Sequence, residues 1–148
     1  MYATVTHPIP RTEGCEVCKA RAERESKMQE KRMNEADNWY QYFLRSSIEI
    51  KHHANLRCKQ RAISMIKLKG SLEDGLPISL HRKPNGDIHM VIFTSYKEGT
   101  VYRPLHICVA ITAGRKCIVK TIYDPRSQPY KWNASYTKRI CWCKEDNS

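Results

Sequence analysis

The sequence predicts an α+β fold in which N-terminal helices pack on a four-stranded, mostly antiparallel sheet. Residues 19–44 contain neither Pro nor Gly and are rich in strong helix formers such as Ala, Glu, Lys, Arg, Met and Gln. A second helix is expected from residue 50 to about residue 61, before the pattern changes to apolar runs typical of strands. Those runs lie at residues 76–81, 89–95, 105–112 and 116–123.

Capping and turn residues indicate where these helices and strands begin and end. Ser64 is placed to cap a third helix, and Gly70 is suited to end it. Between the first two strands the chain reads Pro-Asn-Gly-Asp, and its Asn85-Gly86 pair tolerates the positive φ of a tight hairpin turn. Residues 113–115 join the last two strands, so the four are expected to form a meander.

The sequence divides into two parts by composition. Residues 1–49 hold an irregular lead-in with a Cys-x-x-Cys pair, followed by the charged helix. Residues 50–148 hold the second helix, the β-meander and a tail with a Cys-x-Cys pair. In that tail, the stretch from Trp132 to Cys143 is expected to add a short helix or an edge strand.

The charge balance favours a polyanionic partner. The 148 residues carry 26 Lys and Arg against 15 Asp and Glu, a formal net charge of +11. Such an excess favours polyanions such as RNA or another nucleic acid, by Coulomb attraction and counterion release. A merely solvated basic surface is the alternative. The basic residues expected to contact a phosphate backbone lie on the first helix: Lys19, Arg21, Arg24, Lys27, Lys31 and Arg32.

No membrane location is expected, because the longest apolar run, near residues 105–111, is far too short to span a bilayer. The start of the chain also lacks the pattern of a secretory signal. We therefore expect a cytoplasmic protein whose seven cysteines stay reduced.

Two close-spaced cysteine pairs then indicate a structural Zn²⁺ site. Cys15 and Cys18 lie near the N-terminus, and Cys141 and Cys143 lie near the C-terminus. Four thiolates suit tetrahedral zinc, and such a site would join the two chain ends. Ordinary reduced cysteines are the alternative.

A row of basic side chains on the second helix is the clearest functional signal. His53, Arg57 and Arg61 are spaced four residues apart, so on a helix they lie on one face. A second His and Arg occur in the sequence Arg103-Pro-Leu-His106. If the sheet brings them to the helix, the result is a basic, titratable cleft suited to phosphate.

The same residues carry a family resemblance. The segment His53-Ala-x-x-Arg57-x-x-x-Arg61-x-Ile-Ser, Arg103-Pro-Leu-His106, a Tyr123-Asp-Pro turn and Trp132 together resemble the bacterial domain of unknown function 4258. The resemblance covers about residues 50–136 and leaves both cysteine pairs outside. Ala62 departs from the pattern, where the family often has Gly. The family implies no settled activity, but its layout is similar to that of ribonuclease toxins of the RelE and BrnT kind, an analogy at the level of fold.

The resulting hypothesis is a metal-independent ribonuclease of toxin or phage-associated type. His53 and His106 would be the acid and base, since the histidine pKa lies near neutrality. Arg57, Arg61 and Arg103 would stabilise charge on the phosphate. Two aromatic residues complete the site, with Tyr123 as an auxiliary donor and Trp132 as a stacking surface.

Structural roles explain several of these residues equally well. His106 can be a satisfied core histidine, the two helical arginines can pair with nearby carboxylates, and Trp132 can cover the core. A non-catalytic, zinc-stabilised module that binds nucleic acid or inhibits a protein partner therefore stays open beside the enzyme. A ribonuclease toxin would also have a protein that neutralises it.

Overall fold

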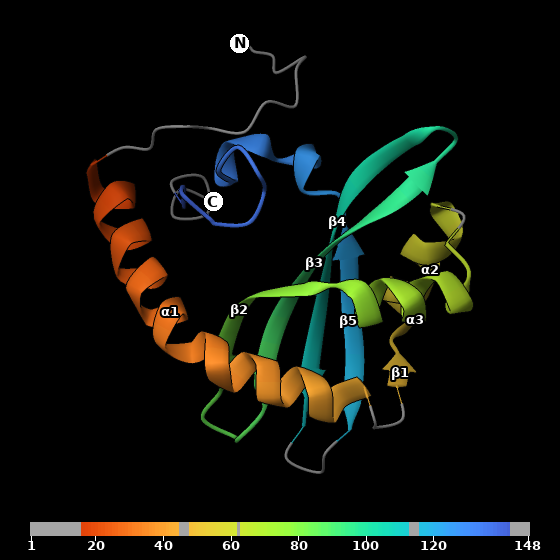
Figure 1. Cartoon of the computed structure of the whole chain (residues 1–148), viewed down its shortest axis with the longest axis horizontal. Helices are drawn as coiled ribbons and strands as arrows, with labels where there is room; N and C mark the ends of the chain where they lie inside the picture. The colour runs from red at the N-terminus through yellow and green to blue at the C-terminus, as the bar shows by residue number, and fades with distance from the viewer. Residues whose placement is uncertain (1–15, 45–47, 62, 113–115, 143–148) are drawn as a thin grey trace. The chain divides into compact units, whose positions relative to one another are not determined.

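The structure, a computed structural model, describes residues 16–44, 48–61, 63–112 and 116–142, and for residues 33–44, 65 and 98 it describes the backbone alone. The described chain contains three α-helices and five strands (Figure 1). The helices are α1 (Glu16–Leu44), α2 (His52–Gln60) and α3 (Met65–Asp74). The strands are β1 (Ile48–Ile50), β2 (Leu76–Arg82), β3 (Ile88–Glu98), β4 (Val101–Ile111) and β5 (Cys117–Tyr123).

Contacts within the chain divide it into two units. One is formed by Met1–Met28 together with Pro125–Ser148, and the other by Gln29–Asp124. The boundary at the N-terminal side falls inside α1. This grouping differs from the division of the sequence at residue 49, because the two chain ends share a unit and the helix contributes to both.

The larger unit contains one five-stranded sheet with the order β1-β5-β4-β3-β2. Strands β2 to β5 form the antiparallel meander that the sequence predicts. The fifth strand, β1, pairs in parallel with β5 and was not predicted, because its three residues are too short to show an alternating pattern. The fold is therefore α+β with a mixed sheet of five strands.

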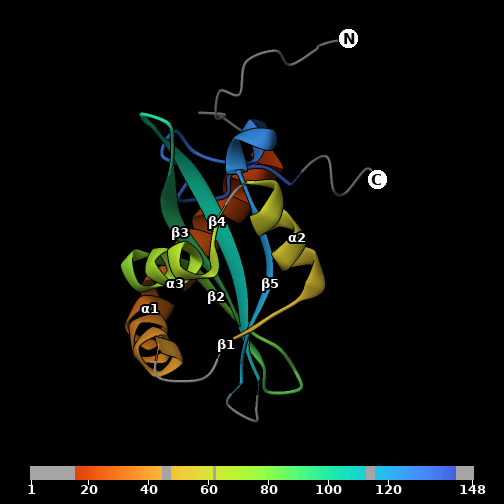
Figure 2. The same ribbon diagram turned by 90° about the vertical axis from the view of Figure 1, so that its right-hand side faces the viewer.

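One apolar core joins the two shorter helices to the sheet. Ala54 and Cys58 of α2 and Leu68 and Leu72 of α3 belong to the same buried cluster as alternate residues of the strands. Figure 2 shows α2 running beside β5 and α3 crossing the sheet near β3. On β4 the core residues are at odd positions, Leu105, Ile107, Val109 and Ile111. Because side chains alternate along a strand, the even positions of β4 face the other side of the sheet.

Polar side chains of α1 occupy the exposed edge of the sheet at β2. The Leu80 N–H donates to Gln29 Oε1 at 2.9 Å, and Arg32 Nη1 donates to the Leu80 carbonyl at 3.0 Å. An edge strand otherwise presents unpaired backbone groups that invite pairing with another chain. These two bonds satisfy both backbone groups of a residue that is fully buried.

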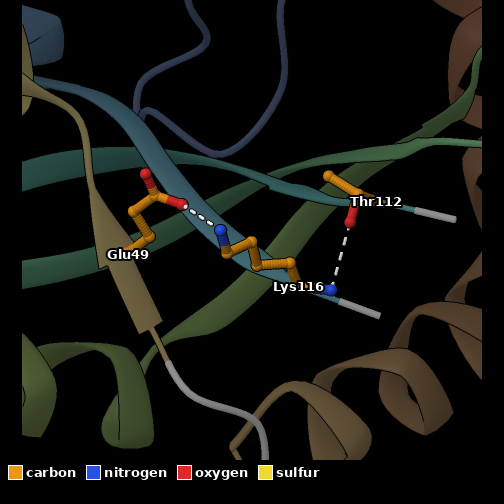
Figure 3. A network of polar contacts seen from close by, with 3 residues as sticks. All are labelled: Glu49, Thr112 and Lys116. Atoms are coloured by element: carbon orange, nitrogen blue, oxygen red, sulfur yellow. Dashed lines mark hydrogen bonds and ion pairs between the residues drawn. The ribbon is translucent and has the colours of Figure 1, made fainter. Parts of the chain in front are cut away.

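The opposite edge is closed by the short strand β1. Lys116, which precedes β5, lies 3.0 Å from a Glu49 carboxylate oxygen, and its N–H donates to the Thr112 hydroxyl at 3.1 Å (Figure 3). The hydrogen bond and charge of Lys116 lower the pKa of the Glu49 carboxyl. Both charged side chains are exposed, so the pair contributes little to stability and mainly fixes the register of β1.

The start of α3 agrees with the sequence prediction, but its end does not. Ser64 caps α3 as expected, since its hydroxyl accepts from the Lys67 N–H at 3.1 Å. Gly70 does not end this helix. The helix continues through it to Asp74, and Gly75 is the residue that follows the last turn. The hairpin turn is confirmed, with Gly86 at φ 93°.

The described part of the smaller unit has little regular structure beyond the start of α1. Two 3₁₀-helices, Pro125–Ser127 and Pro129–Lys131, precede an isolated bridge between Trp132 and Arg139. Among residues 132–142, neither the expected short helix nor the expected edge strand is formed, and this bridge is their only pairing. Along the described segments, no helix is long and apolar enough to cross a bilayer.

The bonds at Leu80 predict the stability of one variant. Replacing Gln29 by Ala leaves the buried Leu80 N–H without its acceptor, so we expect the free energy of unfolding to fall by about 1–3 kcal/mol. Urea unfolding followed by far-UV circular dichroism measures the change. Glu30→Ala is the matched control, because Glu30 is the exposed neighbour on the same helix. Equal stability of the two variants would show that the bond to Leu80 contributes nothing.

Candidate anion-binding cleft

A cleft of about 670 Å³ opens in the larger unit between α3, the end of α2 and the ends of β3 and β4. Three of its lining residues are cations, Arg61, Lys67 and Lys97, and one is an anion, Asp74. Its hydroxyl groups come from Ser71, Thr94, Ser95, Tyr96 and Tyr102. The cleft therefore combines positive charge with hydrogen-bond donors, which is the chemistry that phosphate oxygens require.

The centre of this lining is a contact between Arg61 and Tyr96. Arg61 lies directly after α2, and its Nη1 donates to the Tyr96 hydroxyl at 3.4 Å. Its Nε is buried and has no hydrogen-bond partner among the described residues. A buried donor without a partner costs free energy unless a water molecule or an ion satisfies it. The described residues therefore satisfy the Arg61 guanidinium only in part.

Arg103 approaches the same tyrosine from β4. Tyr96 and Arg103 are directly paired across β3 and β4, so their side chains project from the same face with Cβ atoms about 5 Å apart. Tyr96 packs against the apolar core beneath the helices. Two predicted site residues, Arg61 and Arg103, are therefore brought together around a residue that the sequence reasoning missed.

Tyr102 and Lys97, paired across β4 and β3, also line the cleft, but their positions place their side chains on the face of the sheet opposite Tyr96 and Arg103. Tyr102 is 69% exposed, and the Lys97 ammonium lies 5.9 Å from the centre of its ring. Exposed aromatic rings next to cations are typical of surfaces on which nucleobases stack. Trp132, which was predicted for this role, is instead buried in the smaller unit.

His106 and Tyr123 form a separate pair on the other face of the sheet. His106 Nδ1 lies 3.1 Å from the Tyr123 hydroxyl, and the His106 ring makes edge contacts with Phe93 and Tyr123. His106 is fully buried. It lies between Leu105 and Ile107, which face the helices, so it points away from them.

The predicted acid and base are consequently not brought together. His53 and Arg57 are exposed on α2, where they follow the expected row that leads to Arg61. His53 is two helical turns, about 12 Å, from Arg61 along the helix axis. The structure groups the six predicted catalytic residues as Arg61 with Arg103, His106 with Tyr123, and two exposed positions on α2.

The predicted nucleic-acid-binding residues of α1 differ in what they contact. Lys19 pairs with Glu16 at 3.7 Å, and the Arg21 guanidinium lies 4.5 Å from the centre of the Trp142 ring. Arg32 is bound to the Leu80 carbonyl. The other three predicted residues are exposed: Arg24, Lys27 and Lys31. Arg21 and Arg32 therefore have structural contacts of their own.

Two of the four predicted zinc ligands are described. Cys18 and Cys141 are both buried in the small core of the smaller unit, while Cys15 and Cys143 lie outside the described residues. Across the described positions, no group of three or more His, Cys, Asp or Glu side chains is arranged to hold a metal ion.

Tyr96 and Lys97 could have been found from sequence only with the strand register. A period-two pattern places Tyr96 on the same face as the core residues of β3, but pairing it with Arg103 requires the position of the β3–β4 turn.

No family model, curated protein or solved structure matches the chain at the level that indicates common ancestry.

The burial of His106 predicts a structural effect of its removal. We expect His106→Ala to lower the free energy of unfolding by about 2–5 kcal/mol, because it leaves a cavity and removes one hydrogen bond of the Tyr123 hydroxyl. His53→Ala, at an exposed position, should change stability by less than about 0.5 kcal/mol. Urea unfolding of both variants is the measurement. A stable His106→Ala protein would contradict a core role for this histidine.

Proposed function

We propose that this protein binds RNA through the cleft around Arg61 and Tyr96, with a phosphate group held by the cationic lining. The observation that supports this most directly is the buried Arg61 Nε, which lacks a partner in the described residues while the same guanidinium positions the Tyr96 hydroxyl. Arg is suited to phosphate because its donors form a rigid, planar fork. The net charge of +11 supplies long-range attraction for the same partner.

The surface around the cleft is consistent with a single strand as the bound form. At the end of the sheet, on the face opposite Tyr96, the exposed Tyr102 ring offers a stacking surface beside Lys97. Exposed basic side chains lie on α2 at Arg57 and Lys59 and directly before it at Lys51. Single-stranded RNA presents unstacked bases together with phosphates, so it can use both kinds of contact.

Gly70 offers a test that leaves the cleft residues in place. A Cβ at Gly70 would meet nothing within 4 Å, so a side chain can be added there without a clash at its first atom. Gly70→Glu adds a carboxylate to the lining, and Gly70→Gln adds a side chain of the same shape without charge. Both replace a glycine inside a helix, so both should keep or raise stability.

We expect Gly70→Glu to weaken the binding of a short, fluorescein-labelled single-stranded RNA by about tenfold at low salt, whereas Gly70→Gln should bind like the wild type. The physical reason is repulsion between the added carboxylate and the phosphate. Fluorescence anisotropy titrations at several salt concentrations give the affinities, which should fall as salt rises. Equal affinities of the two variants would place the RNA elsewhere, and a wild type without salt-dependent binding would refute the proposal.

RNA cleavage without a catalytic metal is a second candidate function at the same cleft. The contact between Arg61 and the Tyr96 hydroxyl favours it, because a positioned hydroxyl can exchange a proton while a guanidinium stabilises charge on the phosphate. In this scheme His106 has no part. The row of His53 and Arg57 would guide the strand toward Arg61.

A cleavage assay separates the two functions. If the protein is a ribonuclease, wild type should cut RNA with and without EDTA, and Tyr96→Phe should lose about 100-fold or more in rate while keeping its affinity. Gel electrophoresis of labelled RNA gives the rate, and the anisotropy titration gives the affinity. Intact RNA with the wild-type protein leaves binding as the function.

A further inference from the structure

Two histidines face each other across β2 and β3, away from the core beneath the helices. His81 is directly paired with His89 in the antiparallel ladder, so their Cβ atoms lie about 5 Å apart on one face of the sheet. His89 is in turn paired with Ala110, an even position of β4. The histidine pair therefore lies on the face of the sheet opposite α2 and α3.

Two lysines from other segments lie near this pair. Lys83 directly follows β2, and Lys120 belongs to β5. Both are near enough for their charges to act on the His89 imidazole. The charge of Lys120 also reaches the Cys108 thiol, another even position of β4, which places Lys120 on the same face as the histidines. We call His81, His89, Lys83 and Lys120 together the histidine surface.

The charges of the histidine surface act against its own protonation. Burial is the largest cause of the lowered pKa of His89, and the positive charges around it add to the effect. The Asp87 carboxylate acts in the opposite direction. His89 is half-buried, and the exposed members are His81, Lys83 and Lys120. An anion bound beside them would offset the cost of adding a proton to His89.

On the basis of the RNA-binding function proposed for the cleft, we infer that the histidine surface is a second RNA contact that strengthens as its histidines become protonated. Exposed ammonium and imidazolium groups bind backbone phosphates through charge and N–H donors. This contact is separate from Arg61 and Tyr96, which lie on the helical face. Lys97, which lines the cleft, lies on the same face as His89 but about 26 Å further along β3.

Linkage sets the direction of the pH dependence. A protonated imidazole binds phosphate more tightly than a neutral one, so RNA binding takes up protons and the affinity rises as the pH falls. Because the pKa of His89 is lowered in the absence of RNA, its part of the gain appears below the ordinary titration range of histidine. Bound RNA in turn raises the pKa of His89.

The first experiment compares RNA affinities at two pH values and constant salt. Anisotropy titrations of a rhodamine-labelled oligouridine, whose base does not titrate in this range, are made at about pH 8 and about pH 5.5. The wild type should bind about tenfold more tightly at the lower pH. The double variant His81→Gln/His89→Gln should lose most of this gain and keep its affinity at the higher pH, and His81→Gln alone, at an exposed position, should lose part of the gain.

His52→Gln is the matched control, because this exposed histidine begins α2 and lies outside the histidine surface. It should keep the full gain in affinity at the lower pH. A full gain in both His81 variants would overturn the inference, and so would a gain that His52→Gln removes.

The cleft variant separates this inference from the function on which it rests. Gly70→Glu should weaken RNA binding by a similar factor at both pH values and keep the gain. A wild type with equal affinity at the two pH values would refute the histidine surface alone. RNA binding that occurs only at the lower pH, and that the double variant loses, would refute the cleft alone.

Nuclear magnetic resonance gives a readout that does not depend on affinity. The Cε1 proton of His89, assigned by its absence from His89→Gln, reports the protonation of that imidazole. Saturating oligouridine should move its titration midpoint upward by about one pH unit, because a nearby phosphate favours the charged form. A midpoint that RNA leaves unchanged would also overturn the inference.

Discussion

The alternation of side chains along β4 is the constraint on which the rest of the structure depends. This strand is the middle one of five, so its two faces decide what each side of the sheet contains. Its odd positions supply the core beneath α2 and α3, and they also carry Arg103 to the helical face beside Tyr96. The even position His106 is thereby committed to the other face with Tyr123. A shift of one residue in register would exchange both sets, which is why the apolar core fixes the register so firmly.

The two edges of the sheet are closed by different means, and this determines where the sheet stays accessible. At β2 the side chains of Gln29 and Arg32 satisfy the backbone of Leu80. At β5 the short parallel strand β1 takes up the edge, and α2 follows directly after it. The cleft opens between α3, the end of α2 and the ends of β3 and β4. The larger unit is thus accessible at the ends of its strands rather than along an edge of the sheet.

Much of the fold could be predicted because it depends on local signals. The absence of Pro and Gly gave α1, the Asn85-Gly86 pair gave the first hairpin, and Ser64 gave the start of α3. Strand β1 could not be predicted, since three residues carry no measurable period. The end assigned to α3 at Gly70 was wrong because packing of Leu68 and Leu72 carries the helix past an unfavourable residue.

The sequence predicted some residues of the candidate site but not how they are grouped in space. The sequence identified Arg61 and Arg103 as members of one basic site, and the structure places both beside Tyr96. It grouped His106 with them because the Arg-Pro-Leu-His segment is contiguous, but residues three apart on a strand point to opposite faces. On α2, His53 and Arg57 are both exposed as their spacing predicts, whereas Arg61 follows the last turn of the helix and contacts Tyr96.

Two locally unfavourable features meet in the lining of this cleft. Gly70 lies inside α3, where glycine costs about 1 kcal/mol relative to alanine although the site has room for a side chain. Arg61 buries an Nε donor that the described residues leave without a partner. Each feature lowers the stability of the isolated chain, and at Gly70 the surroundings leave room for a larger residue. Proteins generally depart from their own folding rules where a ligand supplies the compensation, so the coincidence of both departures at one cationic cleft favours a bound anion as the missing partner.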